Sequence, residues 1–214
     1  PNYAHNATTI EIDNMTAGYK WEQHELEVPL PGQAFKEVTD TTAFIEDPNI
    51  IGDNITLTVT NGSIGIFGTT DNFTIEDITD NNLDNASKIK LAAAESDDVD
   101  FDNTTGILLL TPREDLDIKA RFANSVVNIN VPQGHAFVGG ENSDYGLNIN
   151  TLAARDEVRL KINGDIFNVR TDNNAALSSA NAIVESGAGQ IGTSTDPFRM
   201  DVASGSKITA RGAN

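Results

Sequence analysis

The feature that most constrains this fold is a spacing of 20 residues between like positions in strand-like segments. Asn128, Asn148 and Asn168 fall at this interval in "VNINV", "LNINT" and "FNVRT". The apolar residue after each asparagine recurs with it, and a second apolar series has the same spacing. These two series are Ile129, Ile149, Val169 and Ile118, Val138, Val158. A fixed period of this size indicates stacked repeats.

Short runs of alternating apolar and polar residues occupy most of the chain, whereas helical periodicity is weak. Clear examples are residues 55–59, 116–120, 127–131 and 158–162. Each run ends near Gly, Asn, Asp or Pro, as half-buried strands do at their turns. Two further segments, "AAAESDD" and "NNAALSSANA", are compatible with single helical turns or with loops.

Strands repeated every 20 residues predict an all-β solenoid in which each coil is one repeat. One coil cannot bury its apolar face alone, but stacked coils enclose a continuous core. We expect about ten coils and a length near ~50 Å at ~4.8 Å per coil. Ile129, Ile149 and Val169 should form one inward stack, and the three asparagines an amide ladder. The competing interpretation is a chance coincidence in an asparagine-rich chain.

The repeat does not extend over the whole sequence. Residues 1–42 have no alignable period and hold the only tryptophan, Trp21, so we predict an irregular capping or variant region. Residues 43–214 form the predicted solenoid region, although the period is lost after residue 170. Atypical ends are usual in solenoids.

The composition excludes several classes of partner. The net charge of -18 repels phosphate backbones and anionic membranes, so we expect neither nucleic-acid binding nor membrane insertion. No apolar run approaches the ~20 residues of a membrane span. The absence of cysteine excludes disulfides and thiol chemistry. The first residues do not resemble a signal peptide, so we expect a mature product or a piece of a longer chain.

Longer blocks carry a resemblance to a known family. "NGSIGIFGTTDNFTIED" (61–77) and "GAGQIGTSTDPFRMDVA" (187–203) share Ile-Gly, a small polar loop with Asp, and then Phe before an alternating strand. With 90–120 and 156–167, they resemble repeats of giant secreted bacterial proteins, the filamentous-haemagglutinin-like adhesins and related exoproteins. The resemblance covers about residues 43–214. It implies a right-handed parallel β-helix, export from the cell, and an adhesive or structural role.

The sequence offers no catalytic constellation. His5, His24 and His135 lack metal-ligand spacing, and no serine has a nucleophile motif. Parallel β-helices also host polysaccharide-processing enzymes, whose clefts need acidic and basic residues from neighbouring coils. The basic residues here are few and scattered along the sequence. They include Arg113, Lys119, Arg121, Arg155, Arg159, Lys161 and Arg170. We therefore expect no enzyme, no catalytic residue and no cofactor.

Calcium is the one metal for which the sequence offers candidate ligands. Asp98, Asp100 and Asp102 would lie along one outer strand face if Val99 and Phe101 point inward. An EF-hand would need Gly and Glu where Asn103 and Leu109 stand, so a solvated acidic strand is the simpler interpretation. Seven Asn-x-Ser/Thr sequons leave glycosylation open. They begin at Asn6, Asn14, Asn54, Asn61, Asn72, Asn85 and Asn103.

The end of the chain suggests how the protein assembles. Phe198, Met200 and Val202 alternate with polar residues, and Ile208 and Ala210 do so again, with no helix to cap them. A bare strand edge is a template for another strand. We expect this end to meet a further repeat of a longer chain, or another copy head to tail. The expected function is a structural or adhesive rod that is secreted, extracellular or at the cell surface, with surface glycans as another class of partner. A carbohydrate-binding or carbohydrate-processing β-helix is the alternative.

Overall fold

The computed structural model describes residues 9–12, 48–80, 82–95 and 98–213. Within these ranges the chain is mainly β-strand with two short helices. The strands are β1 (Thr9–Ile12), β2 (Ile50–Gly52), β3 (Ile55–Val59), β4 (Ile66–Phe67), β5 (Asp71–Thr74), β6 (Val99–Asp102), β7 (Ile107–Leu110), β8 (Arg113–Glu114), β9 (Leu116–Ala120), β10 (Val126–Val131), β11 (Ala136–Glu141), β12 (Leu147–Ala154), β13 (Glu157–Asn163), β14 (Ile166–Asn168), β15 (Leu177–Ser179), β16 (Asn181–Ser186), β17 (Met200–Val202) and β18 (Ile208–Arg211). The helices are α1 (Ile75–Thr79) and α2 (Asn85–Ala93). Neither described helix is long and apolar enough to span a lipid bilayer.

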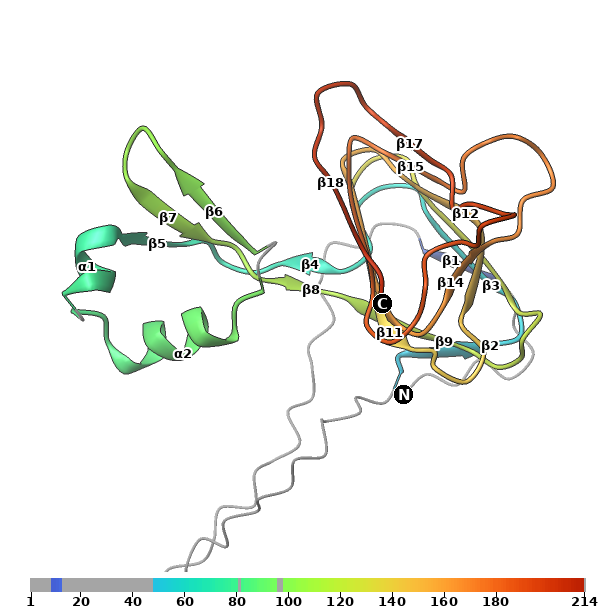
Figure 1. Ribbon diagram of the computed structural model, residues 1–214, viewed down its shortest axis with the longest axis horizontal. Helices are drawn as coiled ribbons and strands as arrows, with labels where there is room; N and C mark the ends of the chain where they lie inside the picture. The colour runs from blue at the N-terminus through green and yellow to red at the C-terminus, as the bar shows by residue number, and fades with distance from the viewer. Residues whose placement is uncertain (1–8, 13–47, 81, 96–97, 214) are drawn as a thin grey trace, which may run out of the picture.

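Two parallel sheets form the walls of a β-solenoid (Figure 1). One sheet has the order β1-β3-β10-β12-β15-β17, with β14 beside β12, and the other has the order β18-β16-β13-β11-β9-β2. From β9 to β18 the chain alternates between the sheets, apart from β14. The parallel β-solenoid predicted from the sequence is therefore confirmed. The coils are about 23 residues apart, close to the predicted 20, and number about 4, so the prediction of ten coils is wrong.

The inward rows show why the spacing was underestimated. One row of the first sheet runs Leu57, Ile129, Leu152, Leu177, Met200. Ile149 lies opposite Val127 and Asn168, so the predicted stack of Ile129, Ile149 and Val169 does not form. The register between β10 and β12 shifts by one residue after Val127, and turn lengths also vary. A bulge of this kind places an extra residue in one strand, which obscures the true repeat in the sequence.

The predicted ladder of three asparagines is also wrong. Asn128 instead accepts a hydrogen bond from the side-chain amide of Asn150, at 2.7 Å between the two amides. Asn148 donates to the carbonyl of Ser125 in the preceding turn. Asn168 is buried and donates to the carbonyl of Pro197 at 3.3 Å. Each amide therefore satisfies a different local need instead of repeating one contact.

The core lies between the two sheets and follows the strand alternation. In the second sheet, one inward row runs Leu116, Val138, Leu160, Val184, Ala210. The first four side chains are at most 2% exposed, and Ile118 and Val158 of the predicted second series are also buried. Burying an aliphatic side chain of this size contributes about 1.5–3 kcal/mol. The stacked rows thus supply most of the apolar burial.

The second sheet contains a break after Ile64. Ile64 bridges to Ala136, and Leu116 pairs with Val138, so the two positions flank Phe137 in the next coil. Residues 65–114 are therefore an insertion that interrupts one strand of this sheet. Across this break, contacts between the β3 and β10 coils join residues 72 positions apart, whereas those between β11 and β13 join residues 22 apart. Removing the insertion brings the first separation to the same value as the second.

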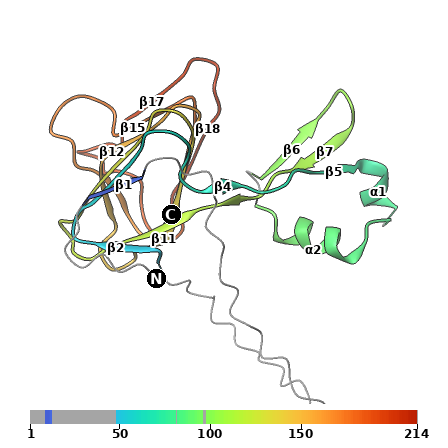
Figure 2. The ribbon, with the colours of Figure 1, turned by 180° about the vertical axis from the view of Figure 1, so that it is seen from behind.

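Residues 65–114, the insertion, form a small antiparallel unit beside the solenoid (Figures 1 and 2). Strands β4 and β8 make its stem, and β5-β7-β6 make its sheet. Thr74 caps α1 by accepting from the amide of Asp77, and Asp84 caps α2 by accepting from that of Ser87. These caps satisfy amides that have no partner inside a helix. The solenoid region expected over 43–214 is thus interrupted by antiparallel structure.

Two other expectations concern segments at the borders. Within 1–42 the structure describes β1, which pairs with β3 as an outer strand, and residues 13–42 lie outside the described residues. The segment "AAAESDD" contributes only the end of α2. The segment "NNAALSSANA" holds strand β15, so a helical turn there is wrong.

Candidate functional site

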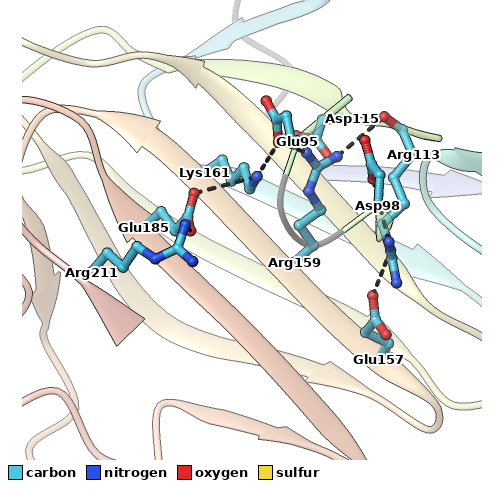
Figure 3. Close-up of polar contacts among 9 residues, drawn as sticks. All are labelled: Glu95, Asp98, Arg113, Asp115, Glu157, Arg159, Lys161, Glu185 and Arg211. Carbon is cyan, nitrogen blue, oxygen red and sulfur yellow. Dashed lines mark hydrogen bonds and ion pairs between the residues drawn. The ribbon is translucent and has the colours of Figure 1, made fainter. Parts of the chain in front are cut away.

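Charged side chains gather where the insertion meets the outer face of the second sheet (Figure 3). The members of this junction cluster come from β8, β13, β16, β18, the segment between α2 and β6, and the residue before β9. They are Glu95, Asp98, Arg113, Asp115, Glu157, Arg159, Lys161, Glu185 and Arg211. Strand β13 alone provides three of them at alternate positions, because every second residue of a strand points to the same face.

An outward row of the second sheet alternates in charge from coil to coil. Its register runs Asp117, Gly139, Lys161, Glu185, Arg211. The Lys161 ammonium lies 3.3 Å from the Glu185 carboxylate, which lies 2.8 Å from the guanidinium of Arg211. Opposite charges that face each other across neighbouring strands stabilise the pairing. The row therefore helps to fix the register of successive coils.

Gly139 makes room for carboxylates in this row. A side-chain Cβ at this glycine would lie 2.6 Å from Asp117 Oδ1 and 3.0 Å from Asp115 Cβ. The side chains of Asp115 and Asp117 therefore extend over the glycine of the neighbouring strand. A larger residue at position 139 would displace both carboxylates, including that of Asp115 in the junction cluster.

Arg159 is the buried centre of the cluster, with 3% of its side chain exposed. It donates to Asp115 Oδ1 at 3.0 Å and to the carbonyl of Arg113 at 3.2 Å. It also pairs with Glu95 of the insertion, which pairs in turn with Lys161. A buried guanidinium requires such partners, because removing one would leave charge in a poorly solvated site.

Asp115 combines burial with a cationic neighbour. Burial raises the pKa of its carboxyl from 3.8 to about 7, and the negative charges of Asp117 and Glu95 act in the same direction. The positive charges of Arg159 and Lys161 oppose this rise in pKa. Asp115 can therefore hold or release a proton near neutral pH, which is the property required of a general acid or base.

Arg113 joins the insertion to the solenoid through both charge and aromatic contacts. Its Nε donates to Glu157 at 2.9 Å, and another of its nitrogens lies 3.3 Å from Asp98. The guanidinium also lies over the rings of Phe67 and Phe137, 5.3 and 5.8 Å from their centroids. Cation–π contacts of this kind are worth about 0.5–2 kcal/mol. The stem is therefore held against β11 and β13.

His135 completes the aromatic group. Its ring stacks on Phe137 with centroids 4.2 Å apart, and its Nε2 lies 3.3 Å from the carbonyl of Gly65. Burial lowers the pKa of the imidazole. Its surroundings are those of a structural residue packed beneath the stem. His5 and His24 lie outside the described residues.

The three aspartates considered as calcium ligands, Asp98, Asp100 and Asp102, have three different roles. Asp98 is buried beside Arg113, and Asp100 is exposed 3.8 Å from Lys207. Asp102 accepts from the amide of Thr104 at 2.8 Å and the hydroxyl of Thr105 at 2.7 Å, which closes the turn between β6 and β7. Phe101 does not point into a core, since 39% of it is exposed. Across the described ranges no group of three or more metal-ligating side chains occurs.

Five sequons fall on described residues. Asn54, Asn61, Asn72, Asn85 and Asn103 are all exposed, and Asn54 accepts from the amide of Val126 at 3.0 Å. Asn6 and Asn14 lie outside the described residues. The five exposed asparagines leave glycosylation open at those positions.

The junction cluster was not foreseen because its basic members are far apart in the sequence. The expectation that the basic residues are scattered is wrong for Arg113, Arg159 and Lys161, which share this face with Arg211. The available signal was the recurrence of charged residues one coil apart along the outward row. The contribution of Glu95 carries no sequence signal, because it depends on how the insertion folds back.

Comparison with known proteins identifies no relative: no family model, no curated protein and no solved structure matches the chain.

Proposed function

We propose that the protein is a structural or adhesive segment of an extracellular or cell-surface rod, extended by adding coils at its β17/β18 end. The parallel β-solenoid fold, in which coils stack on one another, is compatible with this proposal. The acidic surface and the ion-paired state of the junction cluster support it as well, since the buried charges serve to hold parts of the molecule together. The rod's role is to provide length and to display what it carries.

The observation that carries the proposal is the open core at the β17/β18 end. Ile208 occupies the inward row above Ala182, and Ala210 occupies the row above Val184. Ala182 and Val184 are at most 1% exposed, whereas Ile208 is 54% exposed. Met200 and Val202 of β17 are only half-buried. Apolar side chains in inward rows are covered when another coil stacks on them, so this end has the chemistry of an unfinished stack.

The backbone at this end favours the same partner. Strands β17 and β18 are the last in their sheets among the described residues, so their outer N–H and C=O groups can pair with another strand. Arg211 ends the charge-alternating row and is 58% exposed. A following coil with an acidic residue in this row would continue the pattern. The added coil would come from a longer chain or from another copy stacked head to tail, which gives open filaments.

Light scattering of the chain at increasing concentration tests the self-stacking form of the proposal. We expect the mean particle mass to rise, and imaging to show rods. Ile208→Asp with Ala210→Asp should abolish this growth, because it places charge on the exposed end of the core. Ile89→Asp, on the insertion, is the matched control and should not change it. The longer-chain form is tested with a chain to which one designed coil is added at this end. The added coil should cover Ile208, and the extended chain should stay monomeric. Failure of both forms would refute the proposal.

One observation favours the alternative of a carbohydrate-binding or carbohydrate-processing β-helix. The carboxyl of Asp115 has a pKa raised to about 7 and lies beside Arg159 and Lys161. Residues of neighbouring coils do supply both signs of charge here, as such an enzyme requires. Glu95 covers the two cations, which makes this the second candidate. Turnover of an acidic or neutral polysaccharide that Asp115→Asn abolishes would establish it over the structural role.

A further inference from the structure

We propose that the insertion binds a cationic, amphipathic polypeptide segment through an apolar surface surrounded by carboxylates. This inference does not depend on end-to-end stacking, because the surface lies on the insertion and not on the β17/β18 edges. It gives the proposed rod a specific cargo to recognise, and it would hold equally for a protein that never assembles.

The solenoid does not need the insertion to keep its coils regularly spaced. Residues 65–114 leave the second sheet between Ile64 and Asp115, and removing them restores the regular separation of the coils. The core rows on either side are formed by other residues. The backbone path of the coils therefore does not depend on the insertion.

The insertion exposes large apolar side chains. Five of the eight that are exposed in the described residues belong to the insertion. They are Phe67 at 45%, Ile75 at 50%, Ile78 at 37%, Ile89 at 69% and Phe101 at 39%. Ile75 and Ile78 lie one turn apart on α1, so they are on the same side of that helix. A small unit that exposes this many large apolar side chains offers them for contact with a partner.

One of these positions, Phe101, ends an apolar row that crosses the sheet. Phe101, Leu108 and Phe73 lie opposite one another across β6, β7 and β5, and so share one face of the sheet. Phe73 is 5% exposed and Phe101, at the β6 edge, is 39% exposed. Ile75 follows closely after Phe73, at the start of α1. The apolar row therefore becomes open to solvent at its β6 end.

The net charge of the insertion selects the class of binding partner. The insertion holds 11 acidic and 3 basic residues, so it carries -8 of the chain's -18. Glu76, Asp80 and Asp100 are exposed close in sequence to the apolar positions. Two of the three basic residues are already paired, Lys90 with Asp71 and Arg113 with Glu157. The field around the surface is therefore strongly negative.

This field excludes the other occupants. Nucleic acid and anionic lipid would be repelled, and a second insertion would bring the same negative charge to the interface. A segment with Lys or Arg on one side and aliphatic groups on the other satisfies both features of the surface. Such complementarity accelerates association and selects against wrong partners.

Fluorescence anisotropy with labelled synthetic peptides tests the proposal. The probes are an amphipathic Leu/Lys peptide, a Leu/Glu peptide of the same pattern and a Lys/Ser peptide without apolar groups. We expect the Leu/Lys peptide to bind the full chain about tenfold more tightly than the Lys/Ser peptide. The Leu/Glu peptide should not bind. Equal binding of both lysine peptides would overturn the proposal, because attraction to any acidic surface would then suffice.

Matched variants locate the binding. Ile75→Ser with Ile78→Ser and Phe101→Ser should weaken Leu/Lys binding about tenfold. Phe122→Ser with Tyr145→Ser changes two solenoid side chains of similar exposure, 49% and 45%, and should have no effect. If the triple variant disturbs the insertion, Glu76→Gln with Asp80→Asn and Asp100→Asn provides a second test. This variant should weaken binding at low salt while leaving light scattering unchanged. Retained affinity in both sets of insertion variants would refute the assignment.

Discussion

The solenoid and the insertion differ in how they bury apolar residues. In the solenoid, Leu57, Ile129 and Leu152 stack in one row and are at most 1% exposed. In the insertion, α1 buries no side chain, and Ile89 of α2 is 69% exposed. A coil shares its core with two neighbours, whereas a small unit without disulfides must build a core alone. Stacking therefore achieves with short strands what an isolated module of this size does not.

The two regions also differ in charge density. The insertion makes up less than a quarter of the chain but carries -8 of its net charge of -18. On the solenoid, charges alternate along the outward row from Lys161 to Arg211 and pair across the coils. On the insertion, most carboxylates have no basic residue near them in sequence. The solenoid uses charge to fix register, whereas the insertion exposes carboxylates such as Glu76, Asp80 and Asp100 to solvent.

The strongest test of this contrast introduces the same charge into each region. Ile149→Asp places a carboxylate in a fully buried position, and we expect a loss of more than about 4 kcal/mol in the free energy of unfolding. Ile89→Asp makes the same change at a side chain that is 69% exposed, and should cost less than about 0.5 kcal/mol. Urea unfolding measures both. Similar losses would contradict the contrast between the two regions.

Deleting the insertion tests its independence from the solenoid. Removal of residues 65–114 joins Ile64 to Asp115, so Leu116 stays opposite Val138 and Asp115 stays near Arg159. We expect a folded β-solenoid by circular dichroism that unfolds cooperatively.

The matched control removes Asp115 as well, and joins Ile64 directly to Leu116. This slip turns Leu116 outward and Asp117 toward the core, because alternate residues face opposite sides of a sheet. We expect deletion of 65–115 to give a chain less stable than deletion of 65–114 by about 3–5 kcal/mol. Equal stability of the two chains would show that the coil does not fix this register.

The pH dependence of stability tests the contact between the two regions. Asp115 has a pKa raised to about 7 by burial, so the folded state binds its proton more tightly than the unfolded state. Stability should therefore fall as pH rises from about 4 to about 7, by about 2–4 kcal/mol from this group. His135 has a lowered pKa and acts in the opposite direction in this window.

The difference between the wild-type chain and Asp115→Asn isolates the effect of Asp115, because the contribution of His135 cancels. Denaturant midpoints measured between about pH 4 and about pH 8 should be less dependent on pH in the variant. A difference that does not change across this range would show that the carboxyl of Asp115 titrates normally.

The smallest expected effect concerns the amide pair on the solenoid surface. Asn150→Ala removes the 2.7 Å hydrogen bond to Asn128 and should cost about 0.5–1.5 kcal/mol. Asn130→Ala, at an exposed position of β10, should cost less. Thermal unfolding of the two variants compares them. A larger loss for Asn130→Ala would mean that this amide pair does not stabilise the coil.

The sequence predicted the architecture well and the register poorly, for identifiable physical reasons. Alternation in runs such as 116–120 marks half-buried strands wherever they occur, so the solenoid was recognisable. The bulge after Val127 and the different turn lengths make the sequence separation of paired strands vary from coil to coil. The evenly spaced asparagines then suggested a repeat that the backbone does not follow. The period of a sequence therefore indicates that coils stack without indicating which residues lie above one another.

The insertion and the junction cluster were harder to foresee. Strand β6 alternates as solenoid strands do and β7 is a short apolar run, so their antiparallel pairing has no separate signature in "VDFDNTTGILLL". The cluster forms only when β8, β13 and the segment between α2 and β6 are brought together. Arg159 and Glu95 are 64 residues apart, and no motif connects them. Sites that depend on a chain folding back lie beyond what periodicity can predict.

The interruption between Ile64 and Asp115 also has a consequence for the order of folding. Later coils pair strands that are close in sequence, as β11 and β13 are, whereas β3 reaches β10 only across the whole insertion. The longer closure costs roughly 1 kcal/mol more in chain entropy, a penalty that falls on the transition state when the coil forms. We therefore expect nucleation among β10 to β16, with β2 and β3 joining after a folded template exists. The insertion would then slow the pairing of β3 with β10, so that the chain folds from its later coils toward its earlier ones.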